Sequence, residues 1–345
     1  MVGKKLVYYE PQNITLEEMS ELPMCDCGCL LVKVEAAAVC GSDIKAFNVG
    51  NPKMQPGRTM GHEFVGTVVK ANKAADFHEG DRVTMATTIG CGECYYCKLG
   101  KSNLCPDSKA MGFFHNGALA SYVTIPRSAV ENGNVVRVST DIPSEVLALS
   151  EPMSCVLNGI SQVPVESIGS ALVIGLGALG MLHAIALREF GVGNVVCCDF
   201  PGRKSDITQA LGFPTVVPED LDKRYLDMSD GLGFELVVIT APSNAVQAQA
   251  PMYARKGGYV SYFASLPVSD EKIAISSRTL HYNELKYFGT SDSTVEHVKA
   301  AVEVIGKQKD AIAKIITVLP IEDVKSGIEG VLEMKYAKVV VKPNG

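Results

Sequence analysis

The segment ALVIGLGALG at residues 171–180 decides the fold of this 345-residue chain. An apolar strand from Ala171 to Ile174 leads into a GxGxxG string, and a helical segment follows to Phe190. The glycines of such a string permit a tight turn and a close approach of the backbone to a pyrophosphate, whose charge is favoured by the N–H groups and dipole of the helix start. The segment therefore predicts a dinucleotide-binding turn built from Gly175, Gly177, Ala178, Leu179 and Gly180.

A second strand ends in Asp199, nineteen residues after Gly180. A carboxylate at this place can accept hydrogen bonds from the ribose hydroxyls of the adenosine. Glycines also serve ordinary turns, but the order strand, turn, helix, strand and acid favours a dinucleotide. Asp199 would repel the 2′-phosphate of NADP and so favours NAD. Arg203 and Lys204 could instead pair with that phosphate, so NADP is the alternative.

Around this turn, residues 156–289 alternate short apolar runs with helical stretches. Such alternation predicts an α/β domain with a doubly wound parallel sheet wrapped by helices. The expected strands are residues 171–174, 194–198, 236–239, 259–263 and 285–288.

The residues on either side have a different pattern. Residues 1–155 hold short strands separated by Gly, Pro and charged turns, among them 30–36, 64–69 and 121–125, which predicts a mostly β domain. Residues 290–345 carry helical candidates at 295–305 and 321–333 and a closing strand at 338–341. We expect this tail to fold back onto the first domain.

Composition narrows the class of protein. The net charge of -6 comes from interspersed acidic and basic residues, so neither nucleic acid nor an anionic membrane is an expected partner. The N-terminal apolar stretch is too short for a signal peptide, and glycines and His183 interrupt the apolar window at 171–187. The eleven cysteines therefore indicate metal binding in a reducing compartment, and we expect a cytoplasmic protein.

Four cysteines cluster in a short lobe at about residues 90–106, with the spacing C-x2-C-x2-C and then seven residues before the last. Four thiolates can close a tetrahedral zinc shell that leaves no position for substrate. An iron–sulfur cluster is the alternative, but the bacterial ferredoxin run has three residues before its last cysteine. We therefore expect a structural zinc on Cys91, Cys94, Cys97 and Cys105. By contrast, Cys25, Cys27 and Cys29 alternate like one face of an extended segment near a strand start.

A second group of candidate ligands is dispersed along the chain: Cys40-Gly41-Ser42-Asp43, Gly61-His62-Glu63 and Glu151-Pro152. A thiolate, an imidazole and a carboxylate are the ligand types of a catalytic zinc that keeps one position open. Taken singly, each has an ordinary structural explanation, because cysteine and histidine also occur in cores and glutamate on surfaces.

With these motifs in order, and with Gly80-Asp81-Arg82-Val83 between them, the chain closely resembles the zinc-containing medium-chain dehydrogenases, the superfamily of alcohol, sorbitol and threonine dehydrogenases. The resemblance covers nearly the whole chain. It implies a GroES-like catalytic domain built from both ends of the sequence, with a Rossmann domain inserted. It also implies two zinc ions per chain, one of them held by Cys40, His62 and Glu151, with Glu63 able to enter the shell as ligands exchange.

The same resemblance implies how the site works. The zinc stabilises the ionised hydroxyl of an alcohol. A hydride then passes from the carbon that bears this hydroxyl to the nicotinamide, and the alcohol becomes a ketone. Ser42 is expected to hand the proton outward, with Lys45 at the place where a histidine often ends the relay. Asp43 is expected to orient His62.

Two departures bear on the substrate. Glu151 stands where classical alcohol dehydrogenases have a cysteine, which points to the polyol and threonine branch, whose members form tetramers or dimers. Sorbitol dehydrogenases carry an aromatic residue, an arginine and a tyrosine where this chain has Thr290, Ser291, Asp292 and Ser293, which argues against sorbitol. The expected substrate is a secondary alcohol: a polyol, a sugar phosphate or an amino alcohol such as L-threonine.

Two other functions are compatible with the fold. A zinc-independent quinone or enoyl reductase would not need Cys40, His62 and Glu151 together, and a non-catalytic structural relative would be expected to lose ligands.

Overall fold

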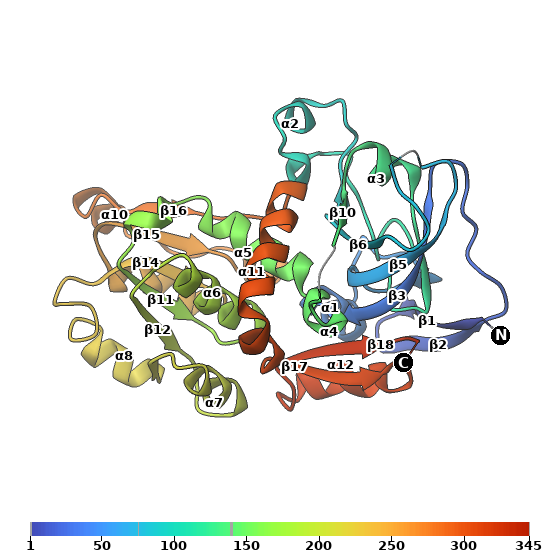
Figure 1. Ribbon diagram of the computed structural model, residues 1–345. Helices are drawn as coiled ribbons and strands as arrows, with labels where there is room; N and C mark the ends of the chain where they lie inside the picture. The colour runs from blue at the N-terminus through green and yellow to red at the C-terminus, as the bar shows by residue number, and fades with distance from the viewer. Residues whose placement is uncertain (1, 75, 139–140, 345) are drawn as a thin grey trace. The chain divides into compact units, whose positions relative to one another are not determined.

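The computed structural model describes residues 2–74, 76–138 and 141–344. The chain divides into two compact units (Figure 1). The first unit comprises Met1–Ser154 and Asp292–Gly345, and the second comprises Cys155–Ser291. The inserted position of the second unit means that both ends of the chain build the first.

The second unit contains a six-stranded sheet in which every described pair of strands is parallel. Its strand order is β13-β12-β11-β14-β15-β16. Because the order proceeds outward in both directions from β11, the sheet has its topological switch point beside this strand, where α/β proteins bind ligands at the carboxyl ends. The strands are β11 Ser170–Ile174, β12 Asn194–Cys198, β13 Thr215–Val216, β14 Phe234–Ile239, β15 Ala254–Tyr262 and β16 Lys286–Phe288.

Helices connect these strands, as the sequence pattern predicts for parallel neighbours. The α-helices are α6 Ala178–Glu189, α7 Arg203–Ala210, α8 Pro218–Arg224, α9 Asn244–Gln249 and α10 Ser277–Tyr282; short 3-10 turns are η2 Val165–Ser167, η3 Ala250–Tyr253 and η4 Val268–Asp270. Apolar side chains from β11, β14 and β15, including Leu172, Phe234 and Val260, form the core. The α/β expectation is confirmed.

The first unit is mostly β. Its seven-stranded sheet has the order β10-β6-β5-β3-β18-β17, with β9 also paired to β3. A three-stranded sheet, β2-β1-β4, and a two-stranded sheet, β7-β8, complete it. The strands are β1 Gly3–Glu10, β2 Asn13–Met19, β3 Leu30–Ala38, β4 Arg58–Thr59, β5 Glu63–Ala71, β6 Arg82–Met85, β7 Thr88–Ile89, β8 Lys109–Ala110, β9 Tyr122–Ile125, β10 Val135–Arg137, β17 Ile316–Pro320 and β18 Lys338–Lys342.

The C-terminal strand β18 lies between strands from opposite ends of the chain. It runs antiparallel to β3, with Val340 opposite Ala38 and Val341 opposite Ala37, and parallel to β17. These positions are apolar and fully buried, so the tail is held by core packing as well as by backbone hydrogen bonds.

Helices of 4 to 19 residues accompany the sheets of the first unit. They are α1 Gly41–Val49, α2 Tyr95–Lys98, α3 Arg127–Glu131, α4 Ser144–Leu147, α5 Ser150–Ile160, α11 Val295–Ala313 and α12 Val324–Leu332, with 3-10 turns η1 Ser102–Leu104 and η5 Ile321–Asp323. The helix expected at 295–305 continues to Ala313, with non-helical backbone angles at Gln308. Helix α5 begins in the first unit and ends in the second.

Arg82 explains the Gly80–Val83 motif. Its Nε donates to Glu35 at 2.9 Å, its Nη1 to the carbonyl of Ile142 at 3.0 Å, and its Nη2 to Ser144 Oγ at 2.8 Å. The arginine therefore ties β6 and β3 to the start of α4, just before the helix that carries Glu151.

Cys25, Cys27 and Cys29 lie just before a strand, β3, as expected, but the expectation that they form one face of an extended segment is wrong. The chain turns at Cys27 and Gly28 instead of running extended, and the turn brings Cys25 and Cys29 into a disulfide with a Cα–Cα distance of 5.6 Å. Gly28, between Cys27 and Cys29, has a φ of +91°, a backbone conformation that does not occur in a strand. The alternating cysteines therefore do not mark a strand.

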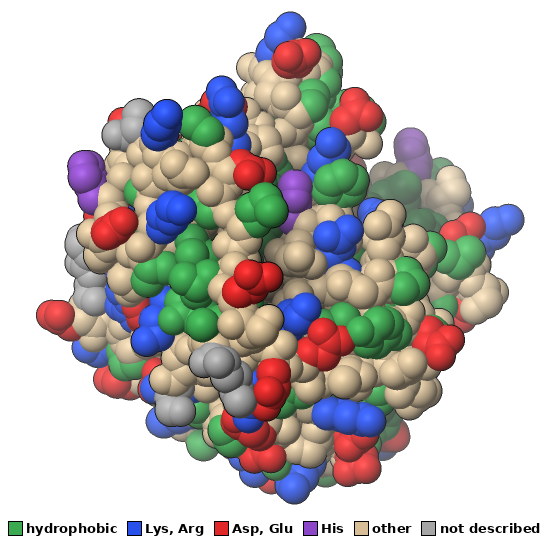
Figure 2. All heavy atoms as spheres, turned by 90° about the vertical axis from the view of Figure 1, so that its right-hand side faces the viewer, with side chains coloured by type: hydrophobic (Ala, Val, Ile, Leu, Met, Phe, Trp, Pro, Cys, Tyr) green, Lys and Arg blue, Asp and Glu red, His purple; other side chains and the backbone are tan. Residues whose placement is uncertain are grey.

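Charge is interspersed over the face of the molecule drawn in Figure 2, where acidic and basic side chains lie next to one another among apolar ones. Over residues 2–74, 76–138 and 141–344, the structure contains no helix with the length and apolar content needed to cross a membrane.

Removing the Phe234 ring should destabilise the second unit. This side chain is 0% exposed, so Phe234→Ala leaves a cavity that costs about 3–5 kcal/mol. Phe200→Ala, at a ring that is 66% exposed, is the matched control and should stay within about 0.5 kcal/mol. Scanning calorimetry should show a lower Tm for Phe234→Ala alone; equal shifts in both variants would contradict the assigned core.

Candidate functional site

Cys40 lies where β3 ends and α1 begins. The backbone N–H of Val39 donates to the carbonyl of Val339 on β18 at 2.9 Å. The carbonyl of Cys40 accepts hydrogen bonds from the N–H groups of Asp43 and Ile44 at the first turn of α1. Cys40 is thus the N-cap of a helix and is anchored to a neighbouring strand, which fixes the direction of its side chain.

His62 and Glu63 come from the start of β5. Both are buried, and the His62 ring lies against Phe113 with a centroid distance of 5.4 Å. The Ser42 hydroxyl lies 3.5 Å from His62 Nε2. Among the described residues, the buried Nδ1 of His62 has no hydrogen-bond partner.

These residues form a candidate metal group. The ligand atoms of Cys40, His62 and Glu63 all lie within 4.8 Å of one another. A thiolate, an imidazole and a carboxylate suit zinc, and a buried ring nitrogen without a partner calls for a ligand of this kind. The residues therefore fit the metal that the sequence predicts, with Glu63 as the carboxylate that lies closest to the other two.

Glu151 is buried at the second residue of α5, but it does not belong to this group. Its backbone carbonyl accepts a hydrogen bond from Ser154 Oγ at 2.6 Å, and Ser154 lies 2.6 Å from Ser293 Oγ. Burial raises the pKa of the Glu151 carboxyl to about 7. Its role as a zinc ligand stays a prediction.

His62 is surrounded by acidic groups. Burial lowers the pKa of its imidazole, but Cys40, Asp43 and Glu151 raise it, and the pKa is well above its usual value. This concentration of negative charge favours a cation in the middle of the group.

Asp43 is expected to orient His62, but among the described residues no hydrogen bond joins the two side chains. Asp43 Oδ2 instead accepts the backbone N–H of Cys40 at 3.0 Å, while Asp43 Oδ1 is buried and, within the described part of the chain, has no hydrogen-bond partner. Asp43 closes the first turn of α1 because its position, three residues after the N-cap, suits a capping box. It acts on His62 through its charge, by raising the imidazole pKa.

The two residues of the expected proton relay have different surroundings. Ser42 is half-buried beside His62, whereas Lys45 is exposed on α1.

Lys338 and Phe113 were missed by the sequence analysis. Lys338, the first residue of β18, lies with its Nζ 2.8 Å from Glu63 Oε1 and 2.5 Å from Glu63 Oε2. The only sequence signal was a lysine at the start of an apolar strand, and Phe113 gave none because its contact with His62 depends on the fold.

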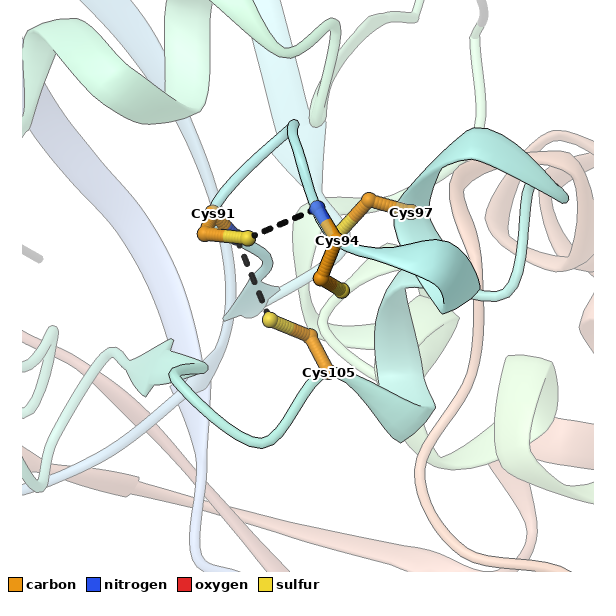
Figure 3. Close-up of side chains that lie close together, drawn as sticks. All are labelled: Cys91, Cys94, Cys97 and Cys105. Atoms are coloured by element: carbon orange, nitrogen blue, oxygen red, sulfur yellow. Dashed lines mark hydrogen bonds between the residues drawn. The ribbon is translucent and has the colours of Figure 1, made fainter.

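The four cysteines of the lobe converge, as Figure 3 shows, and their sulfur atoms lie within 4.8 Å of one another. The N–H of Cys91 donates to Cys105 Sγ and that of Cys94 to Cys91 Sγ, both at 3.3 Å. Hydrogen bonds from the backbone N–H groups of Glu93 and Cys94 lower the pKa of the Cys91 thiol to about 7, whereas desolvation raises that of Cys97 to about 12. A divalent cation would favour the thiolate form at all four, so the group fits a closed zinc site.

The glycine turn connects β11 to α6. Gly175 has a φ of +96°, which favours glycine. A Cβ on Gly180 would lie 1.9 Å from the carbonyl oxygen of Gly175, so the turn can close only with glycine at this position. Gly177 is the N-cap of α6, and Ala178, Leu179 and Gly180 form its first turn. The turn therefore presents a helix N-terminus at the switch point of the sheet, as a pyrophosphate site requires.

Asp199 follows β12 beside this turn. Its Oδ2 accepts the N–H of Leu176 at 2.7 Å and its Oδ1 that of Phe200 at 2.8 Å. A carboxylate has about four acceptor sites, so it can still accept hydrogen bonds from ribose hydroxyls. Arg203 and Lys204 begin α7, four and five residues further along the chain.

Comparisons with known proteins agree with this arrangement. Residues 27–134 match the alcohol dehydrogenase GroES-like domain family. The chain is 28% identical over 309 residues to D-altritol 5-dehydrogenase of Agrobacterium fabrum, covering 87% of this chain and 88% of the other. It is 27% identical over 326 residues to L-threonine 3-dehydrogenase of Caldanaerobacter subterraneus, covering 91% of both.

A solved structure is similar over the same length. A protein of Sinorhizobium meliloti, described as a zinc-binding dehydrogenase and bound to NADP, superposes with a TM-score of 0.88 at 27% identity, over 99% of each chain.

Removing one thiolate from the lobe should cost metal and stability together. We expect Cys97→Ser to lower the zinc content from about two ions per chain to about one, and to lower the Tm, because a closed thiolate site contributes folding free energy. Metal analysis and thermal unfolding check this. Cys27→Ser, at an exposed free cysteine, is the control; a Cys97→Ser protein with the zinc content and Tm of this control would exclude a zinc site in the lobe.

Proposed function

Because the chain belongs to the zinc-containing medium-chain dehydrogenase/reductase superfamily, we propose that it transfers a hydride between a secondary alcohol and NAD. The observation that carries this proposal is the group of half-buried Cys40 with buried His62 and Glu63, whose ligand atoms lie within 4.8 Å of one another. A zinc-independent reductase of the same fold would have no use for such a group, and neither would a structural relative.

The residues of the site divide the work between them. Cys40 and His62, with Glu151 or Glu63, would hold the zinc by three side chains and leave a fourth position for the substrate oxygen. A zinc ion there supplies Lewis acidity that lowers the pKa of a bound hydroxyl. We propose that Ser42, whose hydroxyl lies beside His62, accepts the released proton, and that Lys45 on the exposed face of α1 ends that relay. Phe113 shields the His62 ring from water.

We propose a polyol, a sugar phosphate or an amino alcohol as the substrate. The relatives named above are dehydrogenases of D-altritol and L-threonine, and another, 27% identical over 326 residues, is a D-arabitol-phosphate dehydrogenase of Enterococcus avium. These substrates share a secondary alcohol with polar neighbours. A screen of NAD reduction over polyols, their phosphates and L-threonine tests the proposal; no turnover of any alcohol by fully metallated protein would contradict it.

We also propose a homo-tetramer or homo-dimer that acts in the cytoplasm. The assembly follows the branch that Glu151 indicates, and the compartment follows from the need of two metal groups for reduced cysteines. The Cys25–Cys29 disulfide lies outside both metal groups, and in that compartment its two thiols would be reduced. Light scattering on the purified protein measures the assembly, and a monomer would contradict it.

Replacing His62 should reduce turnover and zinc content while leaving the binding of NAD by the second unit intact. Removing one ligand withdraws the Lewis acid, so we expect His62→Ala to lower kcat by about a thousandfold, since several kcal/mol of charge stabilisation are lost at about tenfold per 1.36 kcal/mol. Zinc content should fall from about two toward about one per chain, because the cysteine lobe is untouched. The Kd for NAD, whose glycine turn lies in the second unit, should change little.

His78→Ala is the control for that experiment, because His78 is exposed and lies outside the group. It should keep normal turnover and metal content. Near-normal turnover by His62→Ala, with its metal content measured, would assign the reaction to a zinc-independent reductase.

Asp199 should decide the choice of cofactor. The ribose hydroxyls of NAD can donate to its carboxylate, whereas a 2′-phosphate is repelled by it. Asp199→Ala should therefore raise the Kd for NAD much more than the Kd for NADP, as measured by fluorescence titration. A wild-type protein that prefers NADP would overturn the assignment and make Arg203 and Lys204 the groups that bind a phosphate.

A further inference from the structure

A cavity of about 550 Å³ lies in the first unit and is lined by none of the candidate metal ligands. Its wall is formed by parts of β1, β2, β4 and β9, by the loop that follows β2, and by the segment 115–117. All of these residues belong to the first unit. The volume is in the range of sites that hold small organic molecules.

Two buried nitrogen atoms of the lining residues have no hydrogen-bond partner among the described residues. They are Nε of Arg58 and Nε2 of His115. Buried polar atoms in folded proteins are nearly always hydrogen-bonded, so two unpaired nitrogens on one cavity indicate an acceptor on a ligand. Asn116 adds donors, because its Oδ1 accepts the N–H of Thr59 at 3.2 Å and its amide N–H groups point elsewhere.

The charges beside these atoms favour an anion. Burial, Lys109 and Arg58 lower the pKa of the His115 imidazole, so the ring is neutral at pH 7 and lies in the field of two cations. A neutral imidazole can still donate from Nε2. The planar guanidinium of Arg58 suits a carboxylate, which can accept two parallel hydrogen bonds from it.

Acidic side chains in the same wall limit the charge of the ligand. Glu18, near the end of β2, and Glu21, just beyond it, are exposed residues of the lining. They disfavour a ligand with several negative charges, but they can accept hydrogen bonds from hydroxyl groups. Lys5 also lines the cavity, and its charge disfavours an ammonium group on the ligand. The wall therefore suits a molecule with one carboxylate and several hydroxyls.

The wall is held by hydrogen bonds that do not involve the unpaired nitrogens. Thr124 Oγ1 donates to the carbonyl of Met24 at 2.9 Å and fixes the loop after β2 to β9. The N–H of Gly117 donates to the carbonyl of Thr59 at 2.8 Å. A Cβ on Gly117 would lie 2.1 Å from the carbonyl oxygen of Gly61, so the two segments that carry the unpaired nitrogens are in direct contact. A wall fixed in this way reduces the entropy cost of binding.

We propose that this cavity is a binding site for a small hydroxycarboxylate, separate from the catalytic metal group. The carboxylate accepts hydrogen bonds from Arg58 and His115, and the hydroxyls donate to Glu18 and Glu21. The inference does not depend on the proposed function, because none of these residues is a candidate metal ligand.

NMR of methionine methyl groups locates a ligand in the cavity without any measurement of turnover. Met24 lines the cavity, whereas Met252 is exposed in the second unit. The probe is gluconate, added to the metal-loaded protein, and the two signals are identified from the spectra of Met24→Leu and Met252→Leu. Gluconate should shift the Met24 signal in a saturable manner and leave the Met252 signal in place. A Met24 signal that moves only together with that of Met252 would overturn the proposal.

Titration calorimetry identifies the groups that bind. Arg58→Gln should raise the Kd for gluconate by roughly 10- to 100-fold, because hydrogen bonds to a charged group are lost. Arg224→Gln, at an exposed arginine of the second unit, is the matched control and should leave the Kd unchanged. Equal Kd values in these two variants would overturn the proposal. His62→Ala should bind gluconate as wild type does; loss of binding there would place gluconate at the metal group and overturn this inference, while the proposed function would stand.

Two further probes test the class of ligand. Hexanoate has a carboxylate without hydroxyls, and inorganic phosphate carries more charge, so both should bind more weakly than gluconate. The double variant Glu18→Ala/Glu21→Ala should weaken gluconate several-fold and leave hexanoate unchanged. Because both glutamates are exposed, this variant keeps the proposal testable if Arg58→Gln does not fold. Tighter binding of phosphate or hexanoate than of gluconate would overturn the assigned class.

Discussion

The pairing of β18 with β3 is the constraint on which the site depends. Val340 and Val341 lie opposite Ala38 and Ala37, two residues before Cys40, so the last strand of the chain fixes the loop that carries the first candidate ligand. The same strand delivers Lys338 to Glu63. Packing of buried valines and alanines thus determines the position of the charged groups, because a strand held by apolar contacts on both sides cannot shift without loss of core packing.

The site gathers four acidic side chains, those of Cys40, Asp43, Glu63 and Glu151, around His62. Asp43 accepts a backbone hydrogen bond at the start of α1, and Glu63 is paired with the buried Lys338. The two carboxylates near His62 are therefore not equivalent. Glu63 is paired with Lys338. Glu151 lies on α5, and burial of its carboxyl group favours the neutral form.

Local patterns in the sequence were sufficient for the glycine turn, the cysteine lobe and the α/β character of the second unit. In each, the residues that act together are close in the chain, so spacing alone carries the geometry. The contact of Lys338 with Glu63, 275 residues apart, and the ring of Phe113 on His62 depend on strand order, which no local pattern encodes. The hydrogen bond of Asp43 to the N–H of Cys40 follows from its position three residues after an N-cap, whereas its role in orienting His62 stays a prediction.

Because the second unit is inserted into the first, the two units can complete their folding at different times during translation. Cys155–Ser291 is continuous in the chain, so its parallel sheet can form on the ribosome as soon as Ser291 has emerged. The first unit lacks β17 and β18 until translation is nearly complete, and it must then close a contact between β3 and β18 across roughly three hundred residues, a slow step in a chain of high contact order. Until that moment, Glu63 has no lysine beside it. The contact between Glu63 and Lys338 is consequently completed only on a full-length polypeptide and not on a nascent one.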